Sequence, residues 1–225
     1  MNGTPNEVAY FNGISFTAQQ QLPLIDVWGT DKTYNHMAVP WTWSFDTPYR
    51  WTKQVASHLG GTRNGMAISW PKRITDRGGI RWQFHHVIDI APMILEAVGI
   101  PQPTMMNGIA QRPIEGVSMA YSWDRTNANA PSQRRTQYFE IFGNRAIYND
   151  GWMASTTPIA TPWNAFEARV PADALNGYRW ELYNLSDDPT QINDLASHEP
   201  DRLRRMQEIW MMEAAASKCF RSATR

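Results

Sequence analysis

Short apolar and aromatic runs alternate with turn-forming residues between residues 136 and 185. Asn149-Asp150-Gly151 is one of these turn signals, and such sequences join neighbouring antiparallel strands in hairpins. Beyond them, apolar residues recur at helical spacing from about residue 200 to residue 216. The pattern predicts a small antiparallel sheet followed by a closing helix. The expected strands are 136–142, 145–148, 152–156 and 178–185.

The clearest helix of the first half covers residues 89–99. Asp89 is placed to cap its N-terminus, and Pro92 lies in the first turn, where a missing N–H group costs nothing. Gly99 follows the last apolar residue of the pattern and is expected to end the helix.

Four other segments of the first half carry weaker patterns. Residues 14–28 predict a short amphipathic helix that a proline disturbs. Residues 30–64 are rich in Gly, Pro, Thr and aromatic residues without a period, as in a long loop, and such loops are often functional. Residues 66–70 are apolar and are followed by proline, which favours a buried strand. Residues 101–135 contain four prolines and are expected to form a loop.

The order of these elements predicts an α/β fold with two parts. Residues 1–135 are expected to be the C-terminal part of an α/β domain, and residues 136–225 a small antiparallel-sheet subdomain with its closing helix. The first part is too short for a complete doubly wound sheet. We therefore expect the beginning of that domain to be missing from this chain.

Charge and cysteine content exclude several classes of partner. Lysine plus arginine balances aspartate plus glutamate at 21 each, which leaves no electrostatic footprint for nucleic acid or an anionic membrane. No apolar run has membrane-spanning length, and residues 1–20 lack the pattern of a signal peptide. Cys219 is the single cysteine, so no intrachain disulfide can form. The cysteine content therefore does not distinguish a reducing from an oxidising cellular compartment. The 11 tryptophans are expected to fill a core or an interface, with an aryl or carbohydrate binding surface as the alternative.

Several segments share their order along residues 3–215 with one enzyme family. They are Thr47-Pro48-Tyr49-Arg50-Trp51-Thr52-Lys53, Gly60-Gly61-Thr62-Arg63, residues 66–71, residues 86–100, residues 107–118, Glu181-Leu182-Tyr183-Asn184-Leu185-Ser186-Asp187-Asp188-Pro189 and Asn193-Asp194-Leu195. In this order they resemble the C-terminal half of arylsulfatases of the alkaline phosphatase superfamily. The resemblance implies a partial alkaline phosphatase-like domain and a sulfuric ester hydrolase that acts on aryl or related sulfate esters.

The resemblance also implies that Lys53 holds the sulfate group. A fixed ammonium stabilises the charge that spreads over the sulfate oxygens and the departing oxygen, more in the transition state than in the ground state. The spacing from Lys53 to Gly60-Gly61 is one residue longer than in the family, and Leu59 and Gly65 stand where the family usually has Glu and Pro. Because of these departures, the backbone between Lys53 and Gly60-Gly61 could follow a different path from that in the family.

Two histidines and an arginine near this lysine are further candidates. His58 and His36 could donate to a sulfate oxygen or protonate a leaving group, with a hydrogen bond to nearby backbone as the structural alternative. Arg63 is a candidate anion-binding residue, with a buried link to a carboxylate as the alternative. His85 and His86 are adjacent without metal-ligand spacing, so we expect no metal there.

The family uses a formylglycine nucleophile, made from Cys or Ser in a C/S-x-P-x-R motif, and calcium held by oxygen ligands. Cys219 lacks the following Pro and Arg. Ser69-Trp70-Pro71-Lys72-Arg73 fits the letters, but it ends an apolar run instead of opening a helix near the start of the domain. Asp187-Asp188 lies where turn chemistry explains it. We therefore expect this chain to lack the nucleophile and the metal ligands and to be inactive alone.

Two alternatives remain at this point. A phosphodiesterase or phosphonate hydrolase of the same superfamily shares the fold and differs in the upstream nucleophile. A non-catalytic remnant that binds an aryl or sugar ligand through its tryptophans is the other. In the sulfatase interpretation, the partners are a small-molecule sulfate ester and a missing N-terminal sulfatase segment, which would cover the apolar face of the first part.

Overall fold

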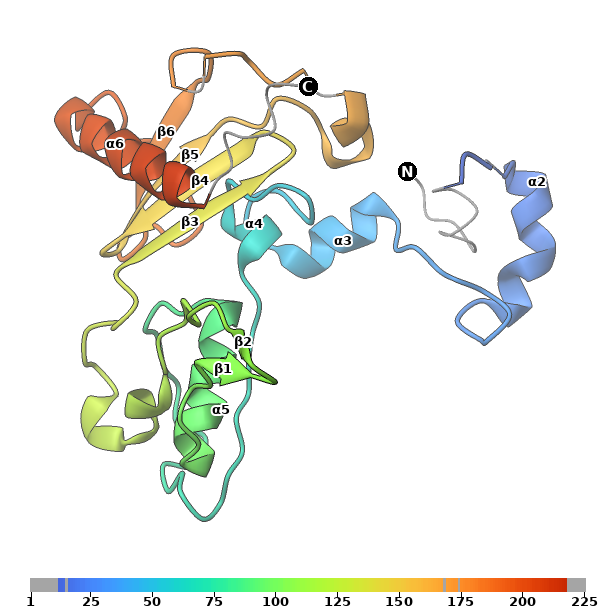
Figure 1. Cartoon of the computed structure of the whole chain (residues 1–225). Coiled ribbons are helices and arrows are strands. Elements are labelled where there is room, and N and C mark those ends of the chain that lie inside the picture. Colours follow the sequence, from blue (N-terminus) through green and yellow to red (C-terminus); the bar gives the residue numbers. More distant parts are fainter. Residues whose placement is uncertain (1–11, 15, 168, 174, 218–225) are drawn as a thin grey trace.

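The computed structural model describes residues 12–14, 16–167, 169–173 and 175–217, and it combines helices with two antiparallel sheets (Figure 1). The larger sheet has the strand order β3-β4-β5-β6, and the smaller one pairs β1 with β2. The helices are α2 (Ala18–Gln21), η1 (Leu22–Val27), α3 (Val39–Asp46), α4 (Leu59–Thr62), η2 (Val87–Asp89), α5 (Ile90–Val98), η3 (Ala120–Trp123), η4 (Arg125–Asn127), η5 (Pro162–Glu167) and α6 (Pro200–Ala216). The strands are β1 (Met105–Met106), β2 (Ile109–Ala110), β3 (Thr136–Ile141), β4 (Asn144–Asn149), β5 (Trp152–Thr156) and β6 (Trp180–Asn184).

The four-stranded sheet forms from consecutive antiparallel strands, as the sequence pattern predicts. Phe142 and Gly143 join β3 to β4, and Asp150 and Gly151 join β4 to β5. All four residues have positive φ angles, of 51°, 79°, 45° and 86°. Two consecutive positive φ angles are typical of type I′ hairpin turns, whose twist matches that of the flanking strands. The four predicted strands are confirmed to within two residues at each end.

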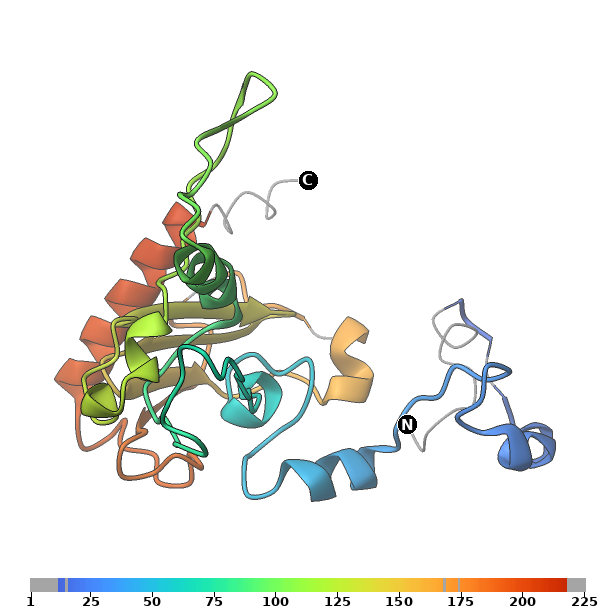
Figure 2. The same ribbon diagram turned by 90° about the horizontal axis from the view of Figure 1, so that it is seen from below.

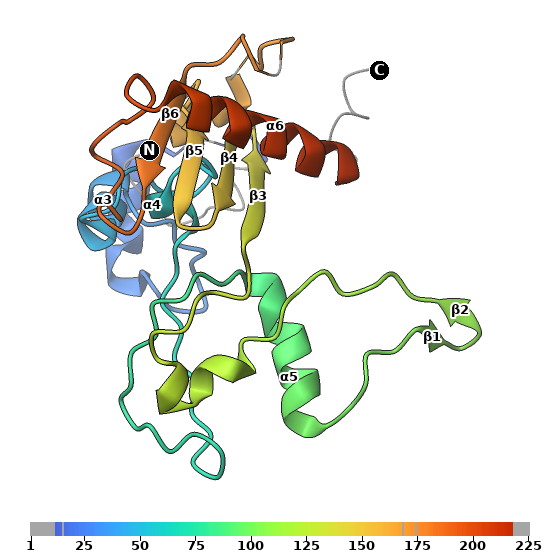
Figure 3. The ribbon, with the colours of Figure 1, turned by 90° about the vertical axis from the view of Figure 1, so that its left-hand side faces the viewer.

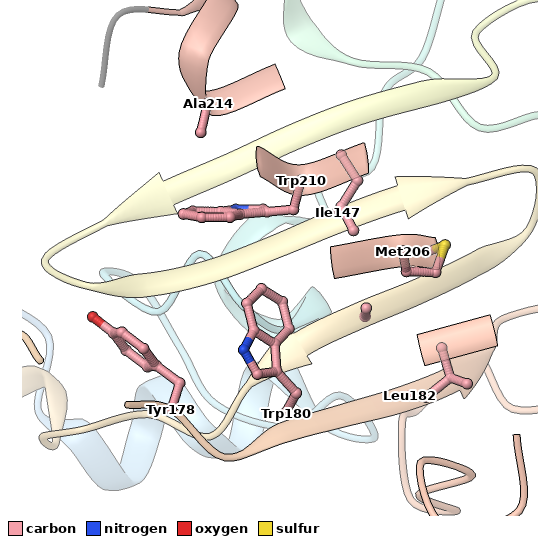
Figure 4. Packing of buried hydrophobic residues seen from close by; sticks show 8 residues of the cluster. Ile147, Tyr178, Trp180, Leu182, Met206, Trp210 and Ala214 are labelled. Atoms are coloured by element: carbon pink, nitrogen blue, oxygen red, sulfur yellow. The ribbon is translucent and has the colours of Figure 1, made fainter. Parts of the chain in front are cut away.

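Helix α6 covers one face of this sheet, in front of the four strands in Figure 3. Trp210 of α6 is 1% exposed, and its ring lies 5.7 Å from that of Tyr138 and 5.8 Å from that of Trp180. Burial of a side chain of this size stabilises the folded state by about 2–3 kcal/mol. The predicted closing helix is therefore confirmed, and the structure adds that it packs along the sheet (Figure 2). Figure 4 shows the labelled core residues Ile147, Tyr178, Trp180, Leu182, Met206, Trp210 and Ala214.

Residues 49–59 cover the opposite face of the same sheet. Leu59, at the start of α4, packs against Ala146 of β4 and Met153 of β5. Because side chains alternate along a strand, Glu181 and Tyr183 of β6 face this side. The sheet is thus enclosed between α6 and the segment that ends in α4 (Figure 3). The division of the chain after residue 135 stays a prediction.

Helix α5 spans the residues that its sequence predicts, but the Asp89 side chain makes no capping hydrogen bond to it. Asp89 occupies the N-cap position, and Gly99 ends the helix in the left-handed conformation, with a φ angle of 69°. The Asp89 carboxylate accepts hydrogen bonds from Nε of Arg134 at 2.8 and 2.9 Å and from the backbone N–H of Val117 at 2.8 Å. Both side chains of this ion pair are buried. Asp89 therefore joins α5 to the loop before the sheet, beyond its role at the helix terminus.

Four expectations about the first half differ from the structure. The predicted loop 101–135 contains the paired strands β1 and β2 and the 3-10 helices η3 and η4. The predicted strand at residues 66–70 is wrong. These residues are extended but pair with no strand in the described part of the chain, and Met66 is 52% exposed. A strand needs a neighbour for its backbone groups, and an apolar run alone does not supply one. The predicted long loop 30–64 contains α3 and α4. The helix predicted at 14–28 is split into α2 and the 3-10 helix η1, which begins one residue before Pro23.

The surface of α5 keeps an apolar stripe. Val87, Ile94 and Val98 recur at intervals of seven and four residues, and all three side chains are exposed. The spacing of four residues places Ile94 and Val98 on one side of α5, and Val87 precedes them on η2. Within the described residues, every helix is too short or too polar to cross a lipid bilayer.

Candidate functional site

Lys53 lies at the corner of a tight turn. The backbone N–H of Val55 donates to the carbonyl oxygen of Thr52 at 3.2 Å, and Gln54 has a positive φ angle of 79°. Thr52 and Val55 are buried, whereas the Lys53 side chain is exposed. In the part of the chain that the structure describes, no hydrogen bond or ion pair involves the Lys53 ammonium. The turn therefore exposes the Lys53 ammonium while the flanking residues Thr52 and Val55 anchor it in the interior.

The glycine pair lies directly against this turn. Gly60 donates its backbone N–H to the carbonyl oxygen of Arg50 at 3.1 Å. A Cβ atom at Gly60 would overlap the carbonyl oxygens of Arg50 and Trp51, and one at Gly61 would overlap that of Val55. Only glycine allows α4 to approach the lysine turn so closely. We define residues 50–63 as the lysine loop.

His58 is fully buried at the N-cap of α4, on the side of the lysine loop that meets the sheet. Its Nδ1 lies 2.9 Å from Oγ of Ser57, and its Nε2 lies 3.1 Å from Oε2 of Glu181 on β6. Burial lowers the pKa of His58, and the nearby Glu181 carboxylate offsets only part of this effect. The ring is therefore neutral near pH 7, which fixes its hydrogen bonds. Nε2–H donates to Glu181, and Nδ1 accepts from the Ser57 hydroxyl.

Glu181 is a buried carboxylate with three donors. Oε2 accepts from His58 and from the Tyr183 hydroxyl at 2.7 Å, and Oε1 accepts from the Thr157 hydroxyl at 2.5 Å. Burial by itself would raise the pKa of Glu181, but these hydrogen bonds outweigh it and lower the pKa to about 2. Burial and the Glu181 charge together raise the pKa of Tyr183 above its ordinary range. The carboxylate is therefore ionised and the phenol protonated at neutral pH.

Further hydrogen bonds join the lysine loop to the sheet region. Nη1 of Arg50 donates to the Tyr183 hydroxyl at 3.1 Å and to the carbonyl oxygen of Gln191 at 2.8 Å. The Gln191 side chain accepts from the backbone N–H of Leu59 at 2.7 Å. Asn144 of β4 donates to the carbonyl oxygen of Gln54 at 3.1 Å. The sequence analysis missed these contacts because each spans 90 residues or more. The one available signal was a glutamate, Glu181, at an inward-facing position of a strand.

The other candidates lie apart from this network. Arg63 is exposed, and its guanidinium carbon lies 4.7 Å from the ring centre of Tyr49 and 6.0 Å from that of Trp82. This is cation–π geometry rather than the carboxylate link considered above. His36 is half-buried on the segment between η1 and α3, outside the lysine loop.

His85 and His86 belong to the Asp89 network. Nδ1 of His85 lies 3.3 Å from the Asp89 carboxylate, and its Nε2 lies 3.2 Å from the Tyr121 hydroxyl. Over the described residues, no three His, Cys, Asp or Glu side chains are grouped so that they could hold a metal ion. The residues present therefore do not fit the calcium site that the resemblance implies.

The structure shows where the serine motif that was considered for the nucleophile lies. Ser69 is exposed on the extended segment, and residues 71–73 form a turn rather than the start of a helix. The Arg73 guanidinium carbon lies 5.4 Å from the ring centre of Trp70. Cys219 lies outside the described residues.

Comparison with known proteins supports one family. The chain is 28% identical over 178 residues to an uncharacterized sulfatase of the yeast Schizosaccharomyces pombe, a match that covers 78% of this chain and 29% of the relative. A solved sulfatase of Bacteroides thetaiotaomicron, from its metabolism of multiple glycosaminoglycans, has the same fold over 74% of this chain and 32% of its own, with a TM-score of 0.52 and 18% identity. Another solved chain, in complex with its substrate D-glucosamine-2-N,6-O-disulfate, is 15% identical over 66% of this chain and 27% of its own, with a TM-score of 0.43.

These matches confirm the resemblance to the C-terminal portion of sulfatases and the predicted fold class. No family model matches the chain. The chain spans less than a third of the length of the yeast relative.

Proposed function

We propose that this chain, which resembles the C-terminal portion of sulfatases, takes part in the hydrolysis of sulfate esters and holds the sulfate group with Lys53. The observation that carries the proposal is the geometry of the lysine loop. An exposed ammonium stands on a turn whose neighbours Thr52 and Val55 are buried, and the loop is joined to a four-stranded sheet by His58. The yeast relative supports the choice of a sulfatase.

The chemistry of the reaction explains why such a cation is useful. When the S–O bond of a sulfate ester breaks, negative charge builds up on the sulfate oxygens and on the departing oxygen. A cation that is already in place stabilises this charge without reorganising during the reaction. Lys53 suits this task because its backbone is held from both sides, by Gly60 and by Asn144. Arg63, on the same loop, offers a second positive charge for the anion.

The rest of the reaction requires groups that the described residues do not bring together. A formylglycine supplies the nucleophile and calcium supplies charge in the family that the chain resembles. The described residues contain no group that fits a metal ion. We propose that both belong to an N-terminal sulfatase segment, either upstream in the same protein or on a separate chain. The proposed substrate is a small sulfate ester, with aryl sulfates as the first class to test.

The exposed apolar side chains of the first half are evidence for an N-terminal sulfatase segment that packs against them. Nineteen large apolar side chains between Ile14 and Ile109 are exposed, including the stripe on α5. Apolar area of this extent marks an interface in a soluble protein. The yeast relative has about 70% of its length outside the match to this chain, which is enough to provide a covering domain.

The test is a reconstitution from two polypeptides. One is this chain, and the other is the part of the yeast relative that precedes the match, treated with a formylglycine-forming enzyme. The mixture, called the reconstituted enzyme below, is assayed with 4-nitrophenyl sulfate and calcium after co-purification shows that the two parts associate. We expect sulfate ester hydrolysis only when both parts are present.

Two results would overturn the proposal. One is association of the two parts without hydrolysis of any sulfate ester. The other is hydrolysis of 4-nitrophenyl phosphate or a phosphodiester in preference to the sulfate, which would favour the related phosphoesterases. Turnover by this chain alone would contradict the proposed division of labour.

A further inference from the structure

A strained backbone surrounds Lys53. Trp51 and Gln54 have φ angles of 67° and 79°, in the left-handed region that residues with a Cβ atom rarely adopt. Each such residue costs about 1 kcal/mol or more, and the conformation persists only when its surroundings fix it. Lys53 lies between the two. The position of its ammonium therefore depends on the contacts that keep this turn in its unfavourable conformation.

Contacts on both sides of the turn supply this support. Asn144 holds the carbonyl group of Gln54, and Gly60 holds that of Arg50. Gly60 belongs to α4, whose N-cap residue is His58. Leu59 of α4 is held by Gln191, and the residue before it, His58, is held by a separate contact that helps to fix α4 and with it Gly60.

His58 is fixed by a buried charge on the sheet. Its contact with Glu181 joins residues 123 positions apart, and both side chains are almost completely buried. Glu181 is itself held by Thr157 and Tyr183, and the Tyr183 hydroxyl also accepts a hydrogen bond from Arg50 of the lysine loop. A buried carboxylate with three donors has one low-energy arrangement, because moving any donor leaves part of the charge unsatisfied.

We propose that His58 and Glu181 are positioning residues for Lys53. Their buried hydrogen bond fixes α4, and α4 holds the strained turn that places the ammonium. His58 touches neither substrate nor reacting atoms in this account, since it is enclosed on all sides. The inference rests on the proposed function, because it assigns the pair a purpose in holding sulfate through Lys53.

Four variants of the full chain separate positioning from general stability. H58Q keeps a donor where Nε2 of His58 lies, so that Glu181 stays paired. H58F fills the space without a donor. The double variant H58F/E181M removes the hydrogen bond and the buried charge together, so it leaves no unpaired carboxylate. It therefore tests the positioning role even if H58F does not fold. W210F weakens the core on the other face of the sheet and serves as the matched control for lost stability.

Two readouts report on the turn without any ligand. The chain has four lysines, Lys32, Lys53, Lys72 and Lys218, so 13C-methylation gives few NMR signals, and K53R identifies the one from Lys53. Hydrogen exchange at the backbone N–H groups of Val55 and Gly60 reports opening of the turn.

We expect H58F and the double variant to shift the Lys53 signal, because the turn that carries this side chain loses its fixed conformation. Exchange at Val55 and Gly60 should become about tenfold faster relative to the amides of β4 and β5. H58Q should behave as the original chain, and W210F should change all amides alike without moving the Lys53 signal.

The inference is overturned if the folded H58F or double variant keeps the original Lys53 signal and exchange rates. It is equally overturned if W210F changes them to the same extent. Because neither readout involves sulfate, an inactive reconstituted enzyme overturns the proposed function and leaves the geometry of the turn untouched. In an active one, H58F should lower kcat/KM about tenfold and H58Q should not.

Discussion

The sheet region and the first half of the chain use similar residues in opposite ways. In the sheet region, Trp180 and Trp210 are buried between β6 and α6. In the first half, Trp41, Trp43 and Trp82 are exposed. The first group is enclosed between two elements of the chain, whereas the second group stays exposed among the described residues.

The two regions also differ in how they are held together. The sheet has an apolar core on each face, and the lysine loop is part of the second. Helix α5 contributes only Met93 as a buried apolar residue, and its firmest link is the ion pair of Asp89 with Arg134. The comparison teaches that the lysine turn packs as part of the sheet region, whose two apolar cores are closed within the chain. The apolar stripe of α5, in contrast, needs a partner.

The largest expected effect separates the two groups of tryptophans. Trp210→Ala should lower the free energy of unfolding by about 3–5 kcal/mol, because it empties a large volume in a closed core. Trp82→Ala is the matched control, since Trp82 is 75% exposed, and it should change stability by less than about 0.5 kcal/mol. Urea unfolding followed by circular dichroism measures both. Equal losses would contradict the division of the molecule into two regions.

The next effect tests the ionic link of α5. Burial alone would raise the pKa of Asp89, but hydrogen bonds from Arg134, His86 and Val117 outweigh it and lower the pKa to about 2 from an ordinary 3.8. The unfolded chain therefore takes up this proton first, and the stabilisation, complete above about pH 4, is lost as the pH falls toward 2. The loss should amount to about 2 kcal/mol.

Urea unfolding at about pH 6 and about pH 3 measures about half of this loss, about 1 kcal/mol, because pH 3 is still above the pKa of Asp89 in the folded chain. The double variant D89L/R134M removes both charges and is the control, because it should show a smaller dependence on pH over this range. An unchanged dependence in the double variant would mean that other carboxylates account for the acid sensitivity.

A smaller effect concerns the hairpin between β4 and β5. Gly151 has a φ angle of 86°, and a Cβ atom there would lie 3.4 Å from the Ser186 hydroxyl oxygen. Gly151→Ala should destabilise the chain by about 1 kcal/mol, chiefly through backbone strain. Gly65→Ala is the control, because Gly65 has no positive φ angle and no atom near the added methyl group. Thermal unfolding of the two variants measures the difference, and equal stabilities would contradict it.

The smallest effect on the isolated chain is expected at the stripe of α5. Replacing Ile94 and Val98 together by serine should leave the free energy of unfolding within about 0.5 kcal/mol, because both side chains are exposed. The same change should abolish association in the reconstituted enzyme. Glu96→Gln, on the same helix, should leave association intact. Association of the double serine variant with unchanged affinity would remove the stripe from the interface.

Local signals predicted the second half of the chain well. The turn at Asp150-Gly151 and the alternation of the strands depend on neighbours within a few residues, and so do the N-cap Asp89 and the terminal Gly99 of α5. Residues 66–70 were assigned to a strand on the same kind of evidence, but a strand requires a partner that no local pattern reveals. Helix α4 was missed because its Gly-Gly sequence is chosen for close packing and not for helix propensity.

The candidate site also has one part that the sequence predicted and one part that it did not. The resemblance to sulfatases, and not the chemistry of a single lysine, selected Lys53. The support beneath it is invisible in the sequence, because His58 meets Glu181 from 123 residues away and Leu59 meets Gln191 from 132. Sequence reasoning left His58 open between a role at the sulfate group, as a donor or an acid, and a hydrogen bond to nearby backbone. The structure places it in the interior, where it bonds to Ser57 and Glu181.

The most direct test of the central claim is the turnover of 4-nitrophenyl sulfate by the reconstituted enzyme with Lys53→Ala, beside Lys72→Ala as a control of equal charge. If Lys53 holds the sulfate group, its loss lowers kcat about a hundredfold to a thousandfold, as the loss of one fixed transition-state contact does elsewhere, and Lys72→Ala leaves kcat unchanged. A Lys53→Ala enzyme that turns over as fast as the Lys72→Ala enzyme would contradict the account.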